Sequence, residues 1–147
     1  MTTPAREQPA SLDAFPFRHS ISTRWADMDI YGHVNNVVFY SFFDTAVAAY
    51  LMGSGVLDPW KSPVIGLVVE TRCVYFREVN VPEPVIAGVK VGRLGSSSVR
   101  YEIGIFQGED TAACAQGHFV HVYVDRQTRR PVPLPEEMRA ALGKLVV

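Results

Sequence analysis

The segment from Val37 to Met52 constrains the fold more than any other part of the chain, because it is the most apolar run and directly follows a dense polar segment. Apolar residues lie on most sides of a helix drawn through it, which predicts a buried helix. Asn35 or Asn36 can cap its start with a side-chain oxygen, and Gly53 can end it. The apolar positions are Val37, Val38, Phe39, Phe42, Phe43, Ala46, Val47, Ala49 and Leu51.

The chain after this helix is typical of strands. Between Ile65 and Phe76 the side chains alternate with a period of two, which predicts a long strand with one mainly apolar face. The breaks that follow are short enough for hairpins. This order predicts an α+β fold, in which an antiparallel sheet wraps around one long apolar helix. The other expected strands cover 85–94, 99–106 and 112–124, with an extended segment at 15–24 and a short final helix from Pro135.

The length of 147 residues is typical of one domain. Residues 1–14 carry Pro4 and Pro9 among small and polar residues, so we expect a flexible N-terminal tail and a single domain over 15–147. The net charge of −1 provides no general field that would attract nucleic acid. We therefore expect no nucleic-acid partner.

The apolar segment is a poor candidate for a membrane span. Ser41, Asp44 and Thr45 interrupt it, and it is shorter than the ~20 residues that a bilayer requires. The N-terminus has no basic region followed by an apolar run, so we see no signal peptide. We expect a cytoplasmic protein with no membrane partner.

The cysteines and histidines give no pattern of metal ligands. Cys73 and Cys114 provide neither a disulfide framework nor zinc spacing. His118 and His121 are three residues apart in a predicted strand, which places them on opposite faces of the sheet. We expect no metal.

The polar segment 24–36 contains two aspartates, a histidine and two asparagines. Asp29 is the aspartate nearer to the buried helix, and a carboxylate there can serve as general base for water or as a nucleophile. Asp27 and Asp29 can equally be Asx-turn residues that only shape the loop. His33 and Asn35 either bind water and substrate or support the turn. The spacing alone leaves these alternatives open.

Two further groups of residues can contact a substrate. The backbone amide of Asn36, at the start of the helix, can polarise a carbonyl oxygen as an oxyanion forms. Asn36, Tyr40 and Asp44 lie on one helix face that points back toward the polar segment. Near a predicted hairpin, a second group either contacts a phosphate or is simply a solvated turn. Its members are Arg93, Ser97, Ser98 and Arg100.

The segment Asp27-Met28-Asp29-Ile30-Tyr31-Gly32-His33-Val34-Asn35-Asn36 resembles the signature of the hotdog-fold acyl-CoA thioesterases, in the 4-hydroxybenzoyl-CoA thioesterase-like superfamily. It looks most like the long-chain acyl-CoA branch and the plant acyl-ACP thioesterases. The similarity covers about residues 20–142. It implies a hotdog fold, a homodimer or dimer of dimers with active sites at the dimer interface, and an acyl-CoA or acyl carrier protein thioester as substrate.

The resemblance also implies roles for individual residues. Asp29 matches the catalytic aspartate, His33 the assisting histidine, and Asn36 the residue whose amide polarises the thioester carbonyl. The assisting asparagine of the plant enzymes falls at Tyr31, so the plant set is incomplete here. Asp44 matches the helix acid that binds the substrate hydroxyl in the aryl-CoA branch. The expected substrate-binding residues are Tyr31, Asn35, Tyr40, Asp44 and Val68, and those expected near the coenzyme A phosphates are Arg93, Ser97, Ser98 and Arg100.

We therefore expect an acyl-CoA thioesterase that releases a free acid and coenzyme A. No cofactor is expected, because a thioester is already activated. Two alternatives stay open: a non-catalytic acyl-CoA-binding hotdog protein, and a hotdog enoyl-thioester hydratase or dehydratase that uses His33. The residues expected to shape an acyl pocket are Val38, Phe42, Val64, Gly66 and Val68.

Overall fold

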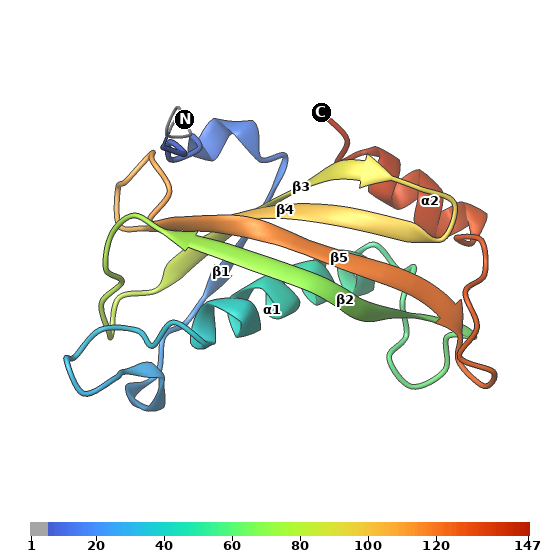
Figure 1. Cartoon of the computed structure of the whole chain (residues 1–147), viewed down its shortest axis with the longest axis horizontal. Helices are drawn as coiled ribbons and strands as arrows, with labels where there is room; N and C mark the ends of the chain where they lie inside the picture. The colour runs from blue at the N-terminus through green and yellow to red at the C-terminus, as the bar shows by residue number, and fades with distance from the viewer. Residues whose placement is uncertain (1–5) are drawn as a thin grey trace, which may run out of the picture.

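The computed structural model describes residues 6–147, which form a curled antiparallel sheet around one long helix (Figure 1). The strand order in the sheet is β1-β3-β4-β5-β2. This arrangement confirms the expected α+β fold. The elements are β1 (Phe17–Ile21), α1 (Val38–Gly53), β2 (Val64–Tyr75), β3 (Val85–Leu94), β4 (Ser98–Gln107), β5 (Ala115–Asp125) and α2 (Glu136–Gly143).

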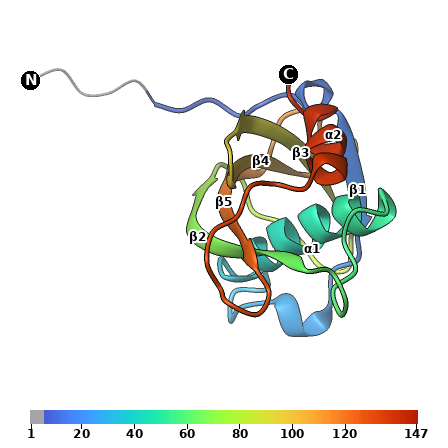
Figure 2. The same cartoon turned by 90° about the vertical axis from the view of Figure 1, so that its right-hand side faces the viewer.

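Helix α1 lies against the inner face of the sheet, and α2 covers the side near β3 (Figure 2). The ring of Phe43 is fully buried and meets Phe119 of β5 edge-on, with 6.2 Å between the centroids. Most of the apolar positions predicted from the sequence thus form the core between helix and sheet, but Val37 is exposed because it precedes the helix. The buried residues of α1 are Phe39, Phe42, Phe43, Ala46, Val47 and Leu51.

The residue at the cap position of α1 is Val37, with no side-chain cap hydrogen bond, so the expectation that Asn35 or Asn36 caps the helix is wrong. The Oδ1 atom of Asn35 accepts a hydrogen bond from the amide of Val37 at 3.2 Å, and the regular helix begins at Val38. The side chain of Asn35 therefore satisfies an amide in the turn before the helix.

Strand β2 forms an open edge of the sheet. It pairs with β5 on one side, and a register shift between Val68 and Glu70 leaves Val69 as an extra residue. Leu67, Val68 and Val69 are exposed, with 60% of the surface of Val69 accessible. The apolar side chains expected to be buried along this strand are therefore only partly covered within one chain.

Residues 6–14 belong to the expected tail and contact the sheet near their C-terminal end. Ser11 forms a bridge with Ala112, and the amide of Ala10 donates to Oε1 of Gln116 at 2.6 Å. Phe15 anchors this arm, because its ring fills the space that side chains at Gly88 and Gly104 would occupy. Residues 1–5 of the expected tail lie outside the described residues.

The two histidines of β5 lie on opposite faces of the sheet, as predicted. His118 lies on the outer face, with Nε2 2.8 Å from Oε2 of Glu70. His121 is buried on the inner face, where its ring centroid lies 5.1 Å from that of Tyr101. Across residues 6–147, no helix has the length and apolarity that crossing a membrane would require.

Candidate active site

The loop before α1 is held by Asp27. This side chain is 2% exposed, and its Oδ2 atom accepts from the amide of Arg24 at 2.8 Å. Its Oδ1 atom accepts from the guanidinium of Arg24, also at 2.8 Å. The carbonyl of Asp27 accepts from the amide of Asn35 at 2.8 Å, so Asp27 joins the two ends of the loop.

Asp29 shapes the loop and also faces a pocket. Its Oδ1 atom accepts from the amides of Tyr31 at 2.8 Å and His33 at 3.2 Å, which is an Asx-type turn. Gly32 completes the turn with a φ of 82°, a left-handed conformation that favours glycine. No residue in 6–147 donates a hydrogen bond to Oδ2 of Asp29, so this oxygen remains available to a substrate or water.

His33 is tied to a segment that is distant in the sequence. Its Nε2 atom lies 3.0 Å from Oε2 of Glu78, and its backbone forms a bridge with Asn80. The amide of the next residue, Val34, donates to the carbonyl of Val79 at 2.9 Å. The loop and the segment 78–80 therefore lie side by side.

Tyr75, the last residue of β2, contacts the start of α1. Its hydroxyl donates to the carbonyl of Asn36 at 3.0 Å, and its ring meets that of Phe39 edge-on at 5.1 Å. Burial raises the pKa of the Tyr75 phenol, so the hydroxyl keeps its proton. Within the described part of the chain, nothing accepts a hydrogen bond from the backbone amide of Asn36.

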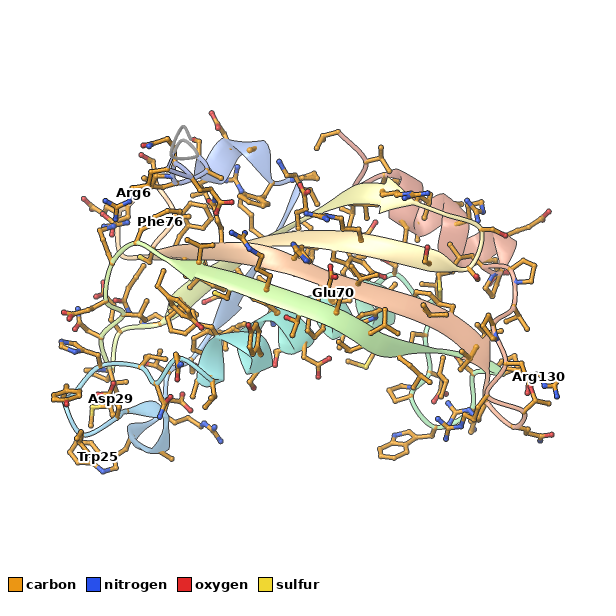
Figure 3. The ribbon with its side chains drawn as sticks, viewed as in Figure 1. Arg6, Trp25, Asp29, Glu70, Phe76 and Arg130 are labelled. Atoms are coloured by element: carbon orange, nitrogen blue, oxygen red, sulfur yellow. The ribbon has the colours of Figure 1, made fainter. Side chains whose placement is uncertain are left out.

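These residues enclose one pocket of about 540 Å³. Polar groups come from the loop, and much of the opposite wall comes from the end of β2 and the segment after it. Figure 3 shows Asp29 and Phe76 at the same end of the sheet. The lining residues are Asp29, Tyr31, His33, Val34, Asn36, Phe39, Tyr75, Phe76, Arg77, Glu78 and Val79.

Other residues predicted from the sequence lie outside this pocket. The side-chain oxygen of Asn35 accepts from the amide of Val37 in the turn before α1. Tyr40 packs edge-on against Phe43, with 5.9 Å between the centroids, and Asp44 is exposed on α1. Val68 lies on the open strand β2, beyond the pocket lining.

The residues expected to bind coenzyme A lie near the opposite end of the sheet. Ser98 pairs with Val122 of β5, which in turn pairs with Leu67 of β2. Tyr75 is eight residues farther along β2 than Leu67, which corresponds to roughly 25 Å at ~3.3 Å per residue. One chain therefore does not bring Ser97, Ser98 or the neighbouring Arg93 to the Asp29 pocket.

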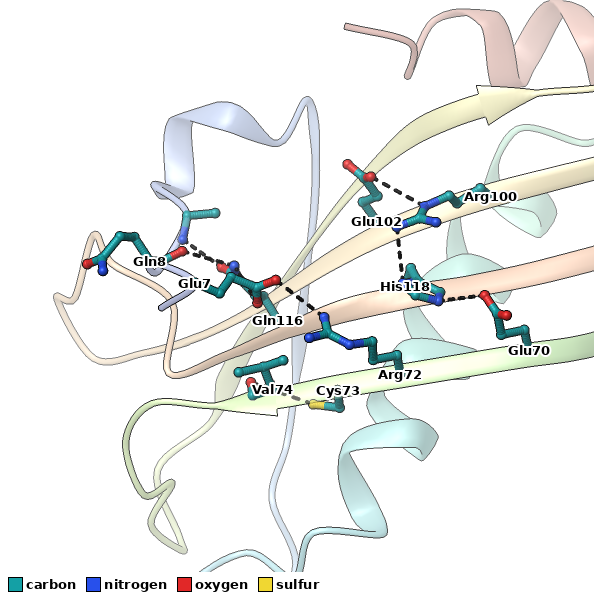
Figure 4. A network of polar contacts seen from close by, with 11 residues as sticks. Glu7, Gln8, Glu70, Arg72, Cys73, Val74, Arg100, Glu102, Gln116 and His118 are labelled. Atoms are coloured by element: carbon teal, nitrogen blue, oxygen red, sulfur yellow. Dashed lines mark hydrogen bonds and ion pairs between the residues drawn. The ribbon is translucent and has the colours of Figure 1, made fainter. Parts of the chain in front are cut away.

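Arg100 belongs to a charged network on the outer face (Figure 4). Its Nη2 atom lies 3.2 Å from Nδ1 of His118, and its Nε atom lies 3.5 Å from Oε1 of Glu102. Lys90 lies 3.8 Å from the same carboxylate group. In this structure the guanidinium of Arg100 therefore contacts His118 and Glu102 on neighbouring positions of the sheet.

Three polar pocket residues received no role from the sequence: Tyr75, Arg77 and Glu78. Arg77 is paired with Asp110 at 2.7 Å and donates to the carbonyl of Ala112 at 2.7 Å. Tyr75 ends a strand, and the other two lie in the irregular segment after it, where no periodicity marks a site. The stretch Tyr75-Phe76-Arg77-Glu78 resembles the end of the corresponding strand in the hotdog thioesterases, but that resemblance gave these residues no role. Among residues 6–147, no three His, Cys, Asp or Glu side chains cluster as metal ligands.

The chain is similar to a known protein family in sequence and to several solved structures in fold. The sequence profile of the thioesterase-like superfamily matches residues 23–142. The PA5185 protein from Pseudomonas aeruginosa strain PAO1 is 49% identical, with 95% of this chain and 97% of that chain covered and a TM-score of 0.92. The PA2801 protein from Pseudomonas aeruginosa, a proposed thioesterase, is 32% identical, with coverage of 85% and 96% and a TM-score of 0.79.

A more distant structure confirms the hotdog fold. Slr0204, a 1,4-dihydroxy-2-naphthoyl-CoA thioesterase from Synechocystis, is 18% identical, with a TM-score of 0.76. The similarity covers 88% of this chain and 96% of that chain. At this identity the likeness concerns the fold alone.

Proposed function

Because this chain belongs to the thioesterase-like superfamily, we propose that it hydrolyses an acyl-CoA thioester to a free acid and coenzyme A, with Asp29 as general base or nucleophile. One observation carries the proposal: Asp29 and Asn36, which both lie in the loop before α1, line the same pocket. Oδ2 of Asp29 and the backbone amide of Asn36 both lack a hydrogen-bond partner among residues 6–147. The carboxylate is suited to act at the carbonyl carbon of a thioester, and the amide is suited to donate to the carbonyl oxygen.

The chemistry follows from these two groups. In the general-base route, Oδ2 of Asp29 takes a proton from water while the water oxygen bonds to the thioester carbonyl carbon. The amide of Asn36 donates to the carbonyl oxygen as negative charge develops there. The carbon–sulfur bond then breaks, and the thiolate takes the proton from Asp29. In the nucleophile route, Oδ2 itself bonds to the carbonyl carbon, the thiolate leaves, and water hydrolyses the resulting anhydride.

The walls of the pocket support an acyl substrate. Val34, Phe39 and Phe76 provide apolar surface beside the polar loop. The resemblance of residues 27–36 to the acyl-CoA thioesterases supports coenzyme A as the leaving group. An acyl carrier protein thioester contains the same thioester linkage and is the other candidate substrate.

We further propose that the working unit is a homodimer formed along the open edge of β2. Exposed apolar residues on a long edge strand favour pairing with another strand. Antiparallel pairing of β2 with β2 of a second copy would place the Val64 end of one chain beside the Tyr75 end of the other. The β3–β4 hairpin of the second copy would then lie at the same end as the Asp29 pocket. This supports a coenzyme A site shared between chains, with Arg93, Ser97, Ser98 and Arg100 as candidates.

A panel of acyl-CoA thioesters with different chain lengths and aryl groups, assayed by thiol release, tests the function. We expect turnover of at least one member. Tight acyl-CoA binding without thiol release would identify a non-catalytic binder. Addition of water to an enoyl-CoA, again without thiol release, would identify a hydratase.

A further inference from the structure

We propose that Tyr75 is a positioning residue that fixes the peptide groups around Asn36, so that the Asn36 amide is aimed into the pocket before substrate binds. This inference rests on the proposed function and adds a residue to it. Tyr75 lies 39 positions from Asn36 in the sequence and reaches it from a strand rather than from the loop or helix.

The peptide groups on both sides of Asn36 are anchored. On the N-terminal side, the carbonyl of Asn35 accepts from the amide of Val38 at 2.9 Å. On the C-terminal side, the carbonyl of Asn36 accepts from the hydroxyl of Tyr75 at 3.0 Å, and the amide of Val37 donates to Oδ1 of Asn35 at 3.2 Å. The amide of Asn36 belongs to the first of these peptide groups and shares its plane with the carbonyl of Asn35. The second group follows directly across the Cα atom of Asn36, so Tyr75 acts on the amide through the backbone torsions of Asn36.

Tyr75 is the side chain that supplies this anchor from outside the loop and helix. The helix alone gives the Asn36 carbonyl only a long contact, because the amide of Phe39 lies 3.3 Å away. The phenol ring of Tyr75 is fixed against Phe39, which restricts the directions that its hydroxyl can take. A donor fixed in this way reduces the rearrangement needed when negative charge develops on the substrate.

The position of Tyr75 in the fold gives the contact a second consequence. Tyr75 ends β2, and its backbone pairs with Ala115 of β5. The hydrogen bond to Asn36 therefore joins the open edge strand to the start of α1. A second copy paired along β2 would therefore influence the direction of the Asn36 amide through Tyr75.

The test is Tyr75→Phe, which keeps the ring against Phe39 and removes only the hydroxyl. We expect kcat to fall about 3- to 10-fold, as for loss of one neutral hydrogen bond, with KM within about twofold of wild type. The matched control is Tyr50→Phe. Tyr50 also donates its hydroxyl to a backbone carbonyl, that of Ala141, but lies outside the pocket lining. This control should keep the wild-type kcat.

An NMR measurement separates this proposal from the proposed function. The amide signal of Asn36 should shift in Tyr75→Phe but not in Tyr50→Phe. If the wild-type protein releases no thiol from any acyl-CoA, the proposed function fails while the NMR comparison still tests the anchor. A wild-type kcat for Tyr75→Phe, or an unchanged Asn36 amide, would overturn the role of Tyr75.

Discussion

Asp27 and Asp29 are separated by one residue, yet the fold places their carboxylates in opposite environments. Asp27 is 2% exposed, and both of its oxygens accept from Arg24. Asp29 uses one oxygen for the loop and presents its side chain to the pocket. The first carboxylate is committed to structure, whereas the second combines a structural contact with an oxygen available for chemistry.

Replacement of Asp29 by asparagine should separate these two uses. The asparagine Oδ1 can still accept from Tyr31 and His33, so the loop should keep its shape, but the charge is lost. We expect thiol release to fall by about 10²- to 10⁴-fold, the usual contribution of a positioned base. The melting temperature should stay close to that of the wild type. Full turnover of the best substrate by Asp29→Asn would refute the assignment.

Replacement of Asp27 by alanine should reduce stability. The amide and guanidinium of Arg24 lose their acceptor, whereas the backbone contact between Asp27 and Asn35 remains. We expect a loss of about 1–3 kcal/mol in the free energy of unfolding, measured by urea denaturation. Asp13→Ala is the control, because Asp13 is exposed on the N-terminal arm. Equal effects of the two changes would contradict the structural role of Asp27.

His121 should make the stability of the fold depend on pH. Burial lowers the pKa of this imidazole to about 4, from 6.5 when exposed. Between these values the unfolded chain binds more protons than the folded chain, so stability rises with pH and is lost as pH falls from 6.5 toward 4. This difference between the folded and unfolded pKa of His121 corresponds to about 3 kcal/mol in the free energy of unfolding.

Urea denaturation across this pH range measures the effect. His121→Phe preserves the aromatic contacts with Tyr101 and Phe119 and removes the titrating group. The variant should lose most of the dependence of its free energy of unfolding on pH. A slope equal to that of the wild type would show that other groups cause it.

The open edge of β2 gives a prediction about assembly. Val69→Lys places a charge on an apolar position that is 60% exposed in one chain. We expect the wild type to be a dimer by light scattering and the variant to shift toward monomer, because burial of an unpaired charge is unfavourable. Val147→Lys, at an exposed position away from the sheet edge, should leave the mass unchanged. A wild-type monomer would refute assembly through β2.

Several features could be predicted from residues close together in the sequence. The long apolar run identified α1, and the alternation with a period of two identified β2, because both patterns are local in the sequence. The polar segment 24–36 was identified as the candidate site, and the resemblance to hotdog thioesterases selected Asp29 within it. Spacing alone could not make that selection, since an Asx turn and a catalytic carboxylate have the same local sequence.

Tyr75 and Glu78 could not be assigned in this way. Each reaches the loop through a contact between distant segments, the hydroxyl of Tyr75 with Asn36 and the carboxylate of Glu78 near His33. The separation of the Asp29 pocket from Ser98 likewise depends on the register of three strands. The sequence by itself determined the order of the elements and the candidate loop, because both follow from local patterns. Only the tertiary structure decided which aspartate is buried and what faces it, because strand register and loop packing depend on residues far apart in the chain.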